Sequence, residues 1–255
     1  MQYITIGSGS AIPQSGRSAP CHLVRVGGRT VVLDLGPGSI WGLVRHGCVN
    51  LREIDLLLFT HLHMDHCADL APFLFALCSR ELARTSPLLI LGPQGLHEHY
   101  RNLQATWDHH VDPAGFHLTI DEWTDGELSW AGCIIDAAPT SHSMPNLAWR
   151  IDAVDAGNCG IVVTGDGQAT DELMDLASSA DHILVAESAA GPGVLLEGHM
   201  NPAQAGDLAQ MCGSKKLILC HINPGSESGA IMKEAMGHFK GEVIVAEDGM
   251  VFDIE

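Results

Sequence analysis

Four side chains of types that bind metal ions lie within a single short stretch of this sequence. They are His61, His63, Asp65 and His66, and they follow residues 56–59, an apolar run typical of a buried strand. Side chains alternate along an extended chain, so His61 and His63 point to the same side, and a turn can bring Asp65 and His66 to a neighbouring point. One ion cannot easily use all four ligands, whereas two ions about 3.5–4 Å apart can. The stretch predicts a metal site; the alternative is a histidine-rich loop satisfied by hydrogen bonds.

Other short apolar runs also end in a His, Asp or Glu. Residues 30–33 precede Asp34, 128–137 lead to His142, 161–164 to Asp166, 183–186 to Glu187, and 217–220 to His221. Each run predicts a buried strand that delivers its polar residue at its carboxyl end. Asp166 lies between two glycines that allow close approach of the backbone, so it suits a carboxylate that bridges two cations.

Helical segments separate these strands. Leu70, Phe73, Leu74 and Leu77 have the spacing of an amphipathic helix that ends before Pro87. Further helices are predicted at 94–108, 170–180, 201–212 and 226–238, and further strands at 3–6, 23–26, 88–91, 242–246 and 250–254, with a hairpin turn at Gly27-Gly28. Strands covered by helices, with polar residues along one edge, indicate a layered α/β protein whose site lies on that edge.

The composition limits the classes of function. The 255 residues, 46% of them hydrophobic, are enough for one domain, which we predict over residues 1–255. The formal net charge of -18 counts against a long nucleic-acid footprint, because such a footprint normally needs a basic patch. Four cysteines, Cys67, Cys78, Cys212 and Cys220, lie in apolar patterns, and no CxxC pair occurs, which favours reduced thiols. Without a signal peptide or a run long enough for a membrane span, we expect a cytoplasmic protein with no membrane partner.

The pattern of these residues resembles a known family. The motif Thr60-His61-x-His63-x-Asp65-His66, together with His142, Gly165-Asp166 and His221, is similar to the metallo-β-lactamase superfamily and, within it, to the ribonuclease Z-like phosphodiesterase branch. The opening loop of residues 7–13 with Arg17, and the segment 33–36, also resemble that branch.

This resemblance implies a four-layer αβ/βα sandwich of two mixed sheets flanked by helices. It also implies one metal ion held by His61, His63, His142 and Asp166, and a second held by Asp65, His66, Asp166 and His221. Zinc is the expected metal, with manganese or iron as alternatives, and a homodimer is the expected assembly.

Two departures from the branch affect the expected substrate. Ribonuclease Z proteins of the tRNA-processing type usually carry a long arm where this sequence has only the 23 residues between His142 and Asp166. Glu187 and His199 match two further motifs of that type, but their neighbouring residues differ. The segments around His199 and His221 look closer to phosphodiesterases that act on small substrates.

These observations lead to several hypotheses of function. The first is a binuclear hydrolase that acts on a small or cyclic phosphodiester. A metal-activated water, oriented by Asp65, attacks the phosphorus. His199, held by Glu187, donates a proton to the leaving oxygen. Glu187 and His199 could equally be a hydrogen-bonded loop pair. The alternatives are a ribonuclease Z acting on tRNA, a hydrolase of sulfate esters or lactones, and a non-catalytic metal-binding scaffold.

Overall fold

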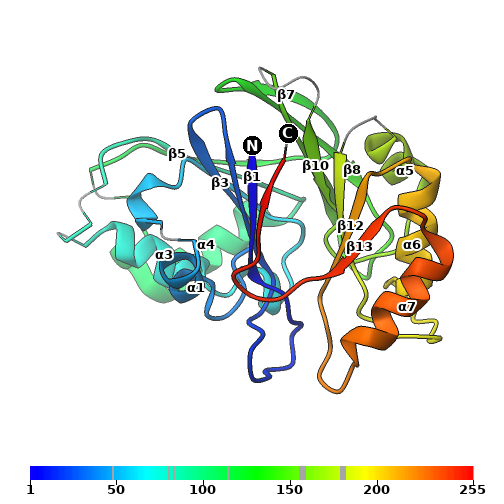
Figure 1. Ribbon diagram of the computed structural model, residues 1–255. Coiled ribbons are helices and arrows are strands. Elements are labelled where there is room, and N and C mark those ends of the chain that lie inside the picture. The colour runs from blue at the N-terminus through cyan, green and yellow to red at the C-terminus, as the bar shows by residue number, and fades with distance from the viewer. Residues whose placement is uncertain are drawn as a thin grey trace.

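Two sheets face each other at the centre of the molecule, and helices cover their outer faces (Figure 1). The structure is a computed structural model that describes residues 1–47, 49–79, 81–82, 84–113, 115–154, 159–178 and 182–254.

The first sheet has seven strands in the order β14-β1-β2-β3-β4-β5-β6. The strands β14, β1, β2 and β3 pair antiparallel, and β3 to β6 pair parallel, so the sheet is mixed. Its strands are β1 (Gln2–Gly7), β2 (Cys21–Val26), β3 (Arg29–Leu33), β4 (Leu56–Leu58), β5 (Leu88–Gly92), β6 (Leu118–Glu122) and β14 (Val251–Asp253).

The second sheet also has seven strands, in the order β13-β12-β11-β10-β9-β8-β7. Here β7 to β10 pair antiparallel and β10 to β13 pair parallel. Its strands are β7 (Gly126–Trp130), β8 (Cys133–Pro139), β9 (Leu147–Ala153), β10 (Gly160–Val163), β11 (His182–Glu187), β12 (Lys216–Cys220) and β13 (Glu242–Val245).

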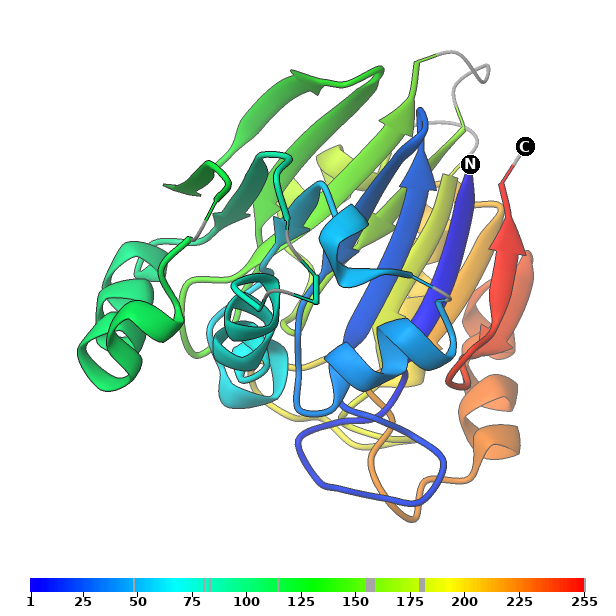
Figure 2. The ribbon, with the colours of Figure 1, turned by 90° about the vertical axis from the view of Figure 1, so that its left-hand side faces the viewer.

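The helices divide between the two outer faces. Figure 2 looks onto the first sheet through α1 (Ser39–Arg45), α3 (Leu70–Leu77) and α4 (Leu96–Trp107). The second sheet is covered by α5 (Asp171–Ala177), α6 (Pro202–Met211) and α7 (Ser228–His238). Shorter helical turns are η1 (Leu51–Glu53), α2 (Met64–Cys67) and η2 (Asp108–His110).

Three separate apolar layers hold this arrangement together. Tyr3 and Trp149 belong to the layer between the sheets, Phe73 to the layer under α3, and Leu208 to the layer under α6. Burial of apolar surface is the main favourable contribution to folding, so each interface fixes one pair of layers. The four-layer αβ/βα sandwich expected from the sequence is confirmed.

The region after β6 differs from the sequence prediction. Residues 128–137 were expected to form one strand, but they belong to the hairpin of β7 and β8, which turns at Ala131 and Gly132. Both turn residues have positive φ, as tight hairpin turns require. The strands β6 and β9 were not predicted either, because polar residues such as Asp121, Arg150 and Asp152 interrupt their apolar character.

The strand order brings the predicted polar residues to one edge. The strands β3, β4, β8, β10, β11 and β12 all end there, and the loops after β1 and before α7 emerge at the same edge, at the bottom of Figure 1. No helix within the described residues is long and apolar enough to cross a membrane. Cys21, Cys67, Cys133, Cys159, Cys212 and Cys220 are free thiols.

Phe73→Ala tests the packing of the first sheet against its helices. The Phe73 side chain is fully buried, and a cavity of its size costs about 3–5 kcal/mol. Phe75→Ala is the matched control, because Phe75 lies on the same helix and is exposed, so its loss should change the free energy of unfolding by only about 0.5 kcal/mol. Urea denaturation measures both; equal effects would contradict the assigned layer.

Candidate metal centre

The motif after β4 begins extended and then turns into a short helix. His63 has extended backbone dihedrals and precedes α2, whose first turn contains Asp65 and His66. This change of direction sends His61 and His63 to one point and Asp65 and His66 to another. The alternation of side chains along an extended strand predicted that His61 and His63 lie together. The short helix α2 was expected only as a loop.

Three imidazole nitrogens converge at the first point. His63 Nδ1 lies 3.0 Å from His61 Nε2 and 3.1 Å from His142 Nε2. The Nδ1 atom of His142 donates to the Gly198 carbonyl at 2.8 Å, so in the neutral ring its Nε2 carries a lone pair directed at the cluster. Three nitrogens at such distances form a donor set that fits a cation such as zinc.

A second group forms around Asp65. Its Oδ2 atom lies 3.3 Å from His221 Nε2 and 3.6 Å from His66 Nε2. His221 follows β12 and has a φ of 57°, a conformation rare outside glycine. Strain of this kind is typical of functional sites.

Asp166 lies between the two groups. Its Oδ1 atom is 3.6 Å from His66 Nε2, and its Oδ2 atom is 3.2 Å from His221 Nε2 and 3.9 Å from His61 Nε2. The side chain is buried, yet Oδ1 has no hydrogen-bond partner among the described residues, and neither has His66 Nε2. Buried polar atoms are normally satisfied, so these two atoms fit positions that a bound cation would complete.

The two glycines beside Asp166 are required by close contacts. Gly165 and Gly167 have φ values of 62° and 116°. A Cβ atom would come within 2.7 Å of a Thr60 side-chain atom at Gly165, and within 2.7 Å of Thr140 Oγ1 at Gly167. No other residue type would let the loop approach Thr60 and Thr140 this closely.

The charges of the cluster compensate one another. Burial alone would raise the pKa of Asp166, but the His221 and His66 imidazoles outweigh it and hold that pKa well below its usual value. Burial would lower the pKa of His66, but Asp166 and Asp34 keep it well above its usual value. Burial, with His66 nearby, lowers the pKa of His61, which keeps that ring neutral and able to act as a ligand.

Asp34 supports the cluster from behind. Its Oδ2 atom accepts from His66 Nδ1 and from Thr60 Oγ1, each at 2.8 Å, and its Oδ1 atom accepts from Thr60 N at 2.8 Å. The hydrogen bond to Nδ1 fixes the His66 ring so that Nε2 faces the cluster. Asp34 was not predicted as a site residue; its place after an apolar strand was the available signal.

Glu187 and His199 form a pair beside Asp166. His199 Nδ1 donates to Glu187 Oε2 at 2.9 Å, and the other Glu187 oxygen accepts from the backbone of Gly167 and Met200. The hydrogen bond to Glu187 raises the pKa of His199 despite partial burial. Burial and the Asp166 charge raise the pKa of Glu187.

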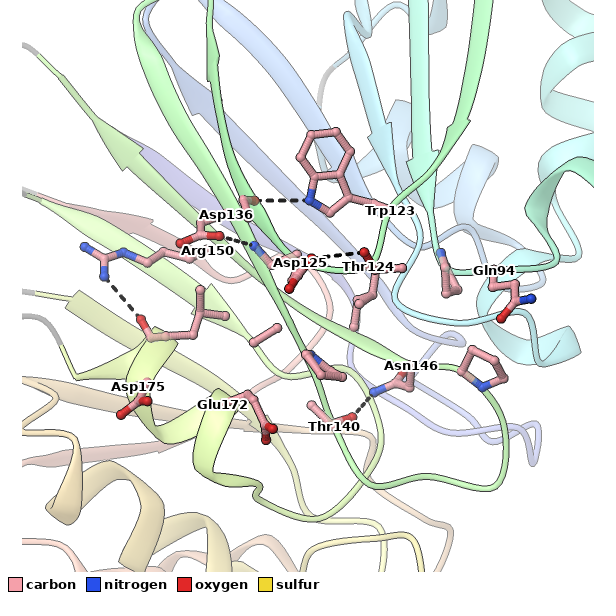
Figure 3. A pocket seen from close by; sticks show the side chains of 18 residues that line it. Gln94, Trp123, Thr124, Asp125, Asp136, Thr140, Asn146, Arg150, Glu172 and Asp175 are labelled. Atoms are coloured by element: carbon pink, nitrogen blue, oxygen red, sulfur yellow. Dashed lines mark hydrogen bonds between the residues drawn. The ribbon is translucent and has the colours of Figure 1, made fainter.

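A cavity of about 760 Å³ lies next to the cluster, and none of the predicted ligands lines it (Figure 3). Thr140 and Asn146 stand at its wall, where their side chains bond each other and both donate to the Asp166 carbonyl. They hold the Asp166 backbone in place and were not predicted from the sequence. The rest of the lining includes Trp123, Arg150 and Glu172.

The structure therefore brings together all the residues predicted from the sequence. His61, His63, Asp65, His66, His142, Asp166, His221, Glu187 and His199 lie at one edge of the sandwich. Five overlapping groups of three within this set could each hold a metal ion. The role of each residue as a ligand or catalytic group stays a prediction.

Comparison with protein families and relatives gives a consistent result. A model of the family described as "Beta-lactamase superfamily domain" matches residues 29–222. A protein named Ribonuclease Z from Mycobacterium sp. (strain KMS) is 30% identical, with 89% of this chain and 87% of that protein covered. An uncharacterized protein of Mycobacterium leprae (strain TN) is 28% identical, with 88% of this chain and 78% of that protein covered.

Solved structures share the fold. The metallo-beta-lactamase fold protein YhfI from Bacillus subtilis has a TM-score of 0.83 at 24% identity, with 98% of both chains covered. The short form of human tRNase Z has a TM-score of 0.80 at 23% identity, with 100% of both chains covered. At these identities the likeness concerns the fold alone.

Asp34→Asn should weaken metal binding without a direct ligand being lost. The substitution keeps the side-chain volume but removes the charge that orients His66, and such outer contacts are typically worth 10–100-fold in metal affinity. Zinc affinity measured by chelator competition should fall within that range, whereas Asp125→Asn, an exposed carboxylate, should leave it unchanged. An unaltered affinity in Asp34→Asn, with native circular dichroism, would contradict the role assigned to Asp34.

Proposed function

The chain belongs to the metallo-beta-lactamase superfamily and is a metal-dependent hydrolase, and from this premise we propose that it cleaves phosphodiesters at a two-ion site. The observation that carries the proposal is the position of Asp166 between two groups of ligands. His61, His63 and His142 would hold one ion, and Asp65, His66 and His221 the other, with Asp166 shared between them. Zinc suits this set of imidazole and carboxylate donors, with manganese or iron as the alternatives.

When bound, the two ions would supply an activated water near neutral pH and positive charge for the substrate oxygens. The residues of the chain then position the reacting groups. Asp65 has one carboxylate oxygen near His221 and His66, so its second oxygen is available to accept a hydrogen bond from the attacking water. Asp166 stays ionised, because two imidazoles face it.

His199 is suited to protonate the leaving oxygen. Glu187 accepts the Nδ1 proton and stabilises the protonated ring, which leaves Nε2 free to donate. Glu187 itself is fixed by two backbone donors, so the ring keeps its orientation. His199 Nδ1 also lies 3.9 Å from Asp166 Oδ2, so the pair borders the cluster, and this position supports a catalytic role over a loop contact alone.

The charge of the chain and the short segment between His142 and Asp166 favour a small or cyclic diester as the substrate. The net charge of -18 repels a long polyanion. Only 23 residues separate His142 from Asp166, and these include β9 and β10, so little chain remains for an RNA-gripping arm.

A ribonuclease Z that acts on tRNA is the second candidate. The relative from Mycobacterium sp. (strain KMS) that carries this name covers most of the chain at 30% identity, which supports this alternative. A basic surface for the RNA would then have to come from a partner subunit, in the homodimer that we propose for this chain.

His199→Ala should lower turnover while the protein keeps its metal. Loss of a positioned proton donor costs on the order of 10²–10⁴ in rate. The readouts are kcat on an aryl phosphodiester and zinc content by mass spectrometry, with the exposed His109→Ala as the control that leaves both unchanged. Release of zinc from His199→Ala would show instead that His199 is a ligand.

Cleavage of two substrates in one buffer separates the candidate functions. The zinc-reconstituted protein should hydrolyse bis(4-nitrophenyl) phosphate and leave a precursor tRNA intact. Rapid 3′ trimming of the tRNA would support the ribonuclease Z alternative. Failure on both substrates would contradict phosphodiester cleavage and direct the search to sulfate esters and lactones, which the same activated water can attack.

A further inference from the structure

Exposed apolar side chains lie on the segments around the cluster of predicted metal ligands. Leu195 is 80% exposed, Met64 76%, Ile12 58% and Leu196 45%. We call these four residues the apolar rim. Isolated exposed apolar residues are common, so the rim is informative only if its members surround one functional site.

Met64 and Leu196 are tied directly to residues of the cluster. Met64 lies between His63 and Asp65 and is the first residue of α2. Leu196 forms a bridge with His199, whose backbone N–H donates to the Leu196 carbonyl at 3.2 Å. Both side chains therefore belong to the segments that carry the site, and Leu195 is the next residue in the same loop.

Hydrogen bonds through Asn223 hold the loop that carries Ile12 at the same edge. The loop that carries Ile12 is joined to Asn223 by Ser10 Oγ, which donates to Asn223 Oδ1 at 2.6 Å. Asn223 follows His221 by two residues, and its Nδ2 atom donates to the Ala189 carbonyl at 2.8 Å. Asn223 thus connects the Ile12 loop with the segment that leads to Leu195.

The loops at this edge contain almost no cations. Residues 8–20, 59–69, 139–146, 164–170, 188–201 and 221–227 are all described, and among them Arg17 is the one Lys or Arg. Arg17 is occupied within the fold, because its guanidinium donates to Ser8 Oγ, the Ala246 carbonyl and Ser228 Oγ. These loops therefore offer apolar contacts and no free Lys or Arg for further phosphates.

From this combination we infer that the substrate carries an uncharged apolar group, alkyl or aryl, next to the bond that is cleaved. The inference rests on the proposed function and narrows its substrate class to hydrophobic monoanionic diesters. The cleaved phosphate lies at the ions, and the apolar group lies against the rim. An oligonucleotide would instead place its next phosphates beside Leu195 and Met64, where these loops supply no free Lys or Arg to neutralise them.

Two esters that differ only in the retained group test this inference. Butyl and ethyl 4-nitrophenyl phosphate share a leaving group, and each fully buried methylene is worth about fourfold. For the open rim we expect kcat/KM to be at least about fivefold higher for the butyl ester. Leu195→Gln should reduce this ratio to about twofold or less, whereas Met211→Gln, an exposed apolar residue on α6, should retain it.

Calorimetric binding of dibutyl and diethyl phosphate to the same zinc-loaded proteins separates the inference from the proposed function. If dibutyl phosphate binds more strongly than diethyl phosphate and Leu195→Gln abolishes this difference, the inference about the apolar rim holds. If no ester is hydrolysed in that case, only the proposed function fails. Hydrolysis with equal kcat/KM for both esters would contradict the inference about the apolar rim, whereas the proposed function would still hold. Equal binding without hydrolysis, or tighter binding of an oligouridylate than of dibutyl phosphate, would also contradict the inference.

Discussion

The buried carboxylate of Asp166 is the constraint on which the site depends. Placing an ionised carboxylate in the interior is costly unless positive charge or hydrogen bonds compensate it. Here the imidazoles of His66 and His221 face it, while Oδ1 has no hydrogen-bond partner in the part of the chain that the structure describes. Gly165 and Gly167 let its backbone approach Thr60 and Thr140, and this close approach holds the carboxylate at the cluster.

The four-layer architecture makes this arrangement possible because both sheets contribute to it. The motif of His61 and Asp65 follows β4 of the first sheet, and Asp166, Glu187 and His221 follow β10, β11 and β12 of the second. The apolar layer between the sheets sets their separation and therefore how far the site residues of the first sheet lie from those of the second. Packing in the core thus fixes the positions of the site residues at the edge of the sandwich.

Local sequence signals predicted most of the fold and of the site. Apolar runs that end in His, Asp or Glu identified β4, β10, β11 and β12, because strands buried on both faces are continuously apolar. The hairpin of β7 and β8 was predicted as one strand, because Ala131 does not signal a turn with positive φ as Asn or Asp would. The contacts of Asp34 and Asn146 join residues distant in sequence, and no local pattern encodes such pairs.

The zinc stoichiometry of the native chain and of Asp166→Ala tests the shared site most directly. Equilibrium dialysis followed by elemental mass spectrometry should find two zinc ions per native chain and at most one in Asp166→Ala, because the variant removes the carboxylate common to both groups. A single equivalent in the native chain, or two fully retained in Asp166→Ala, would contradict a pair of ions that share this residue.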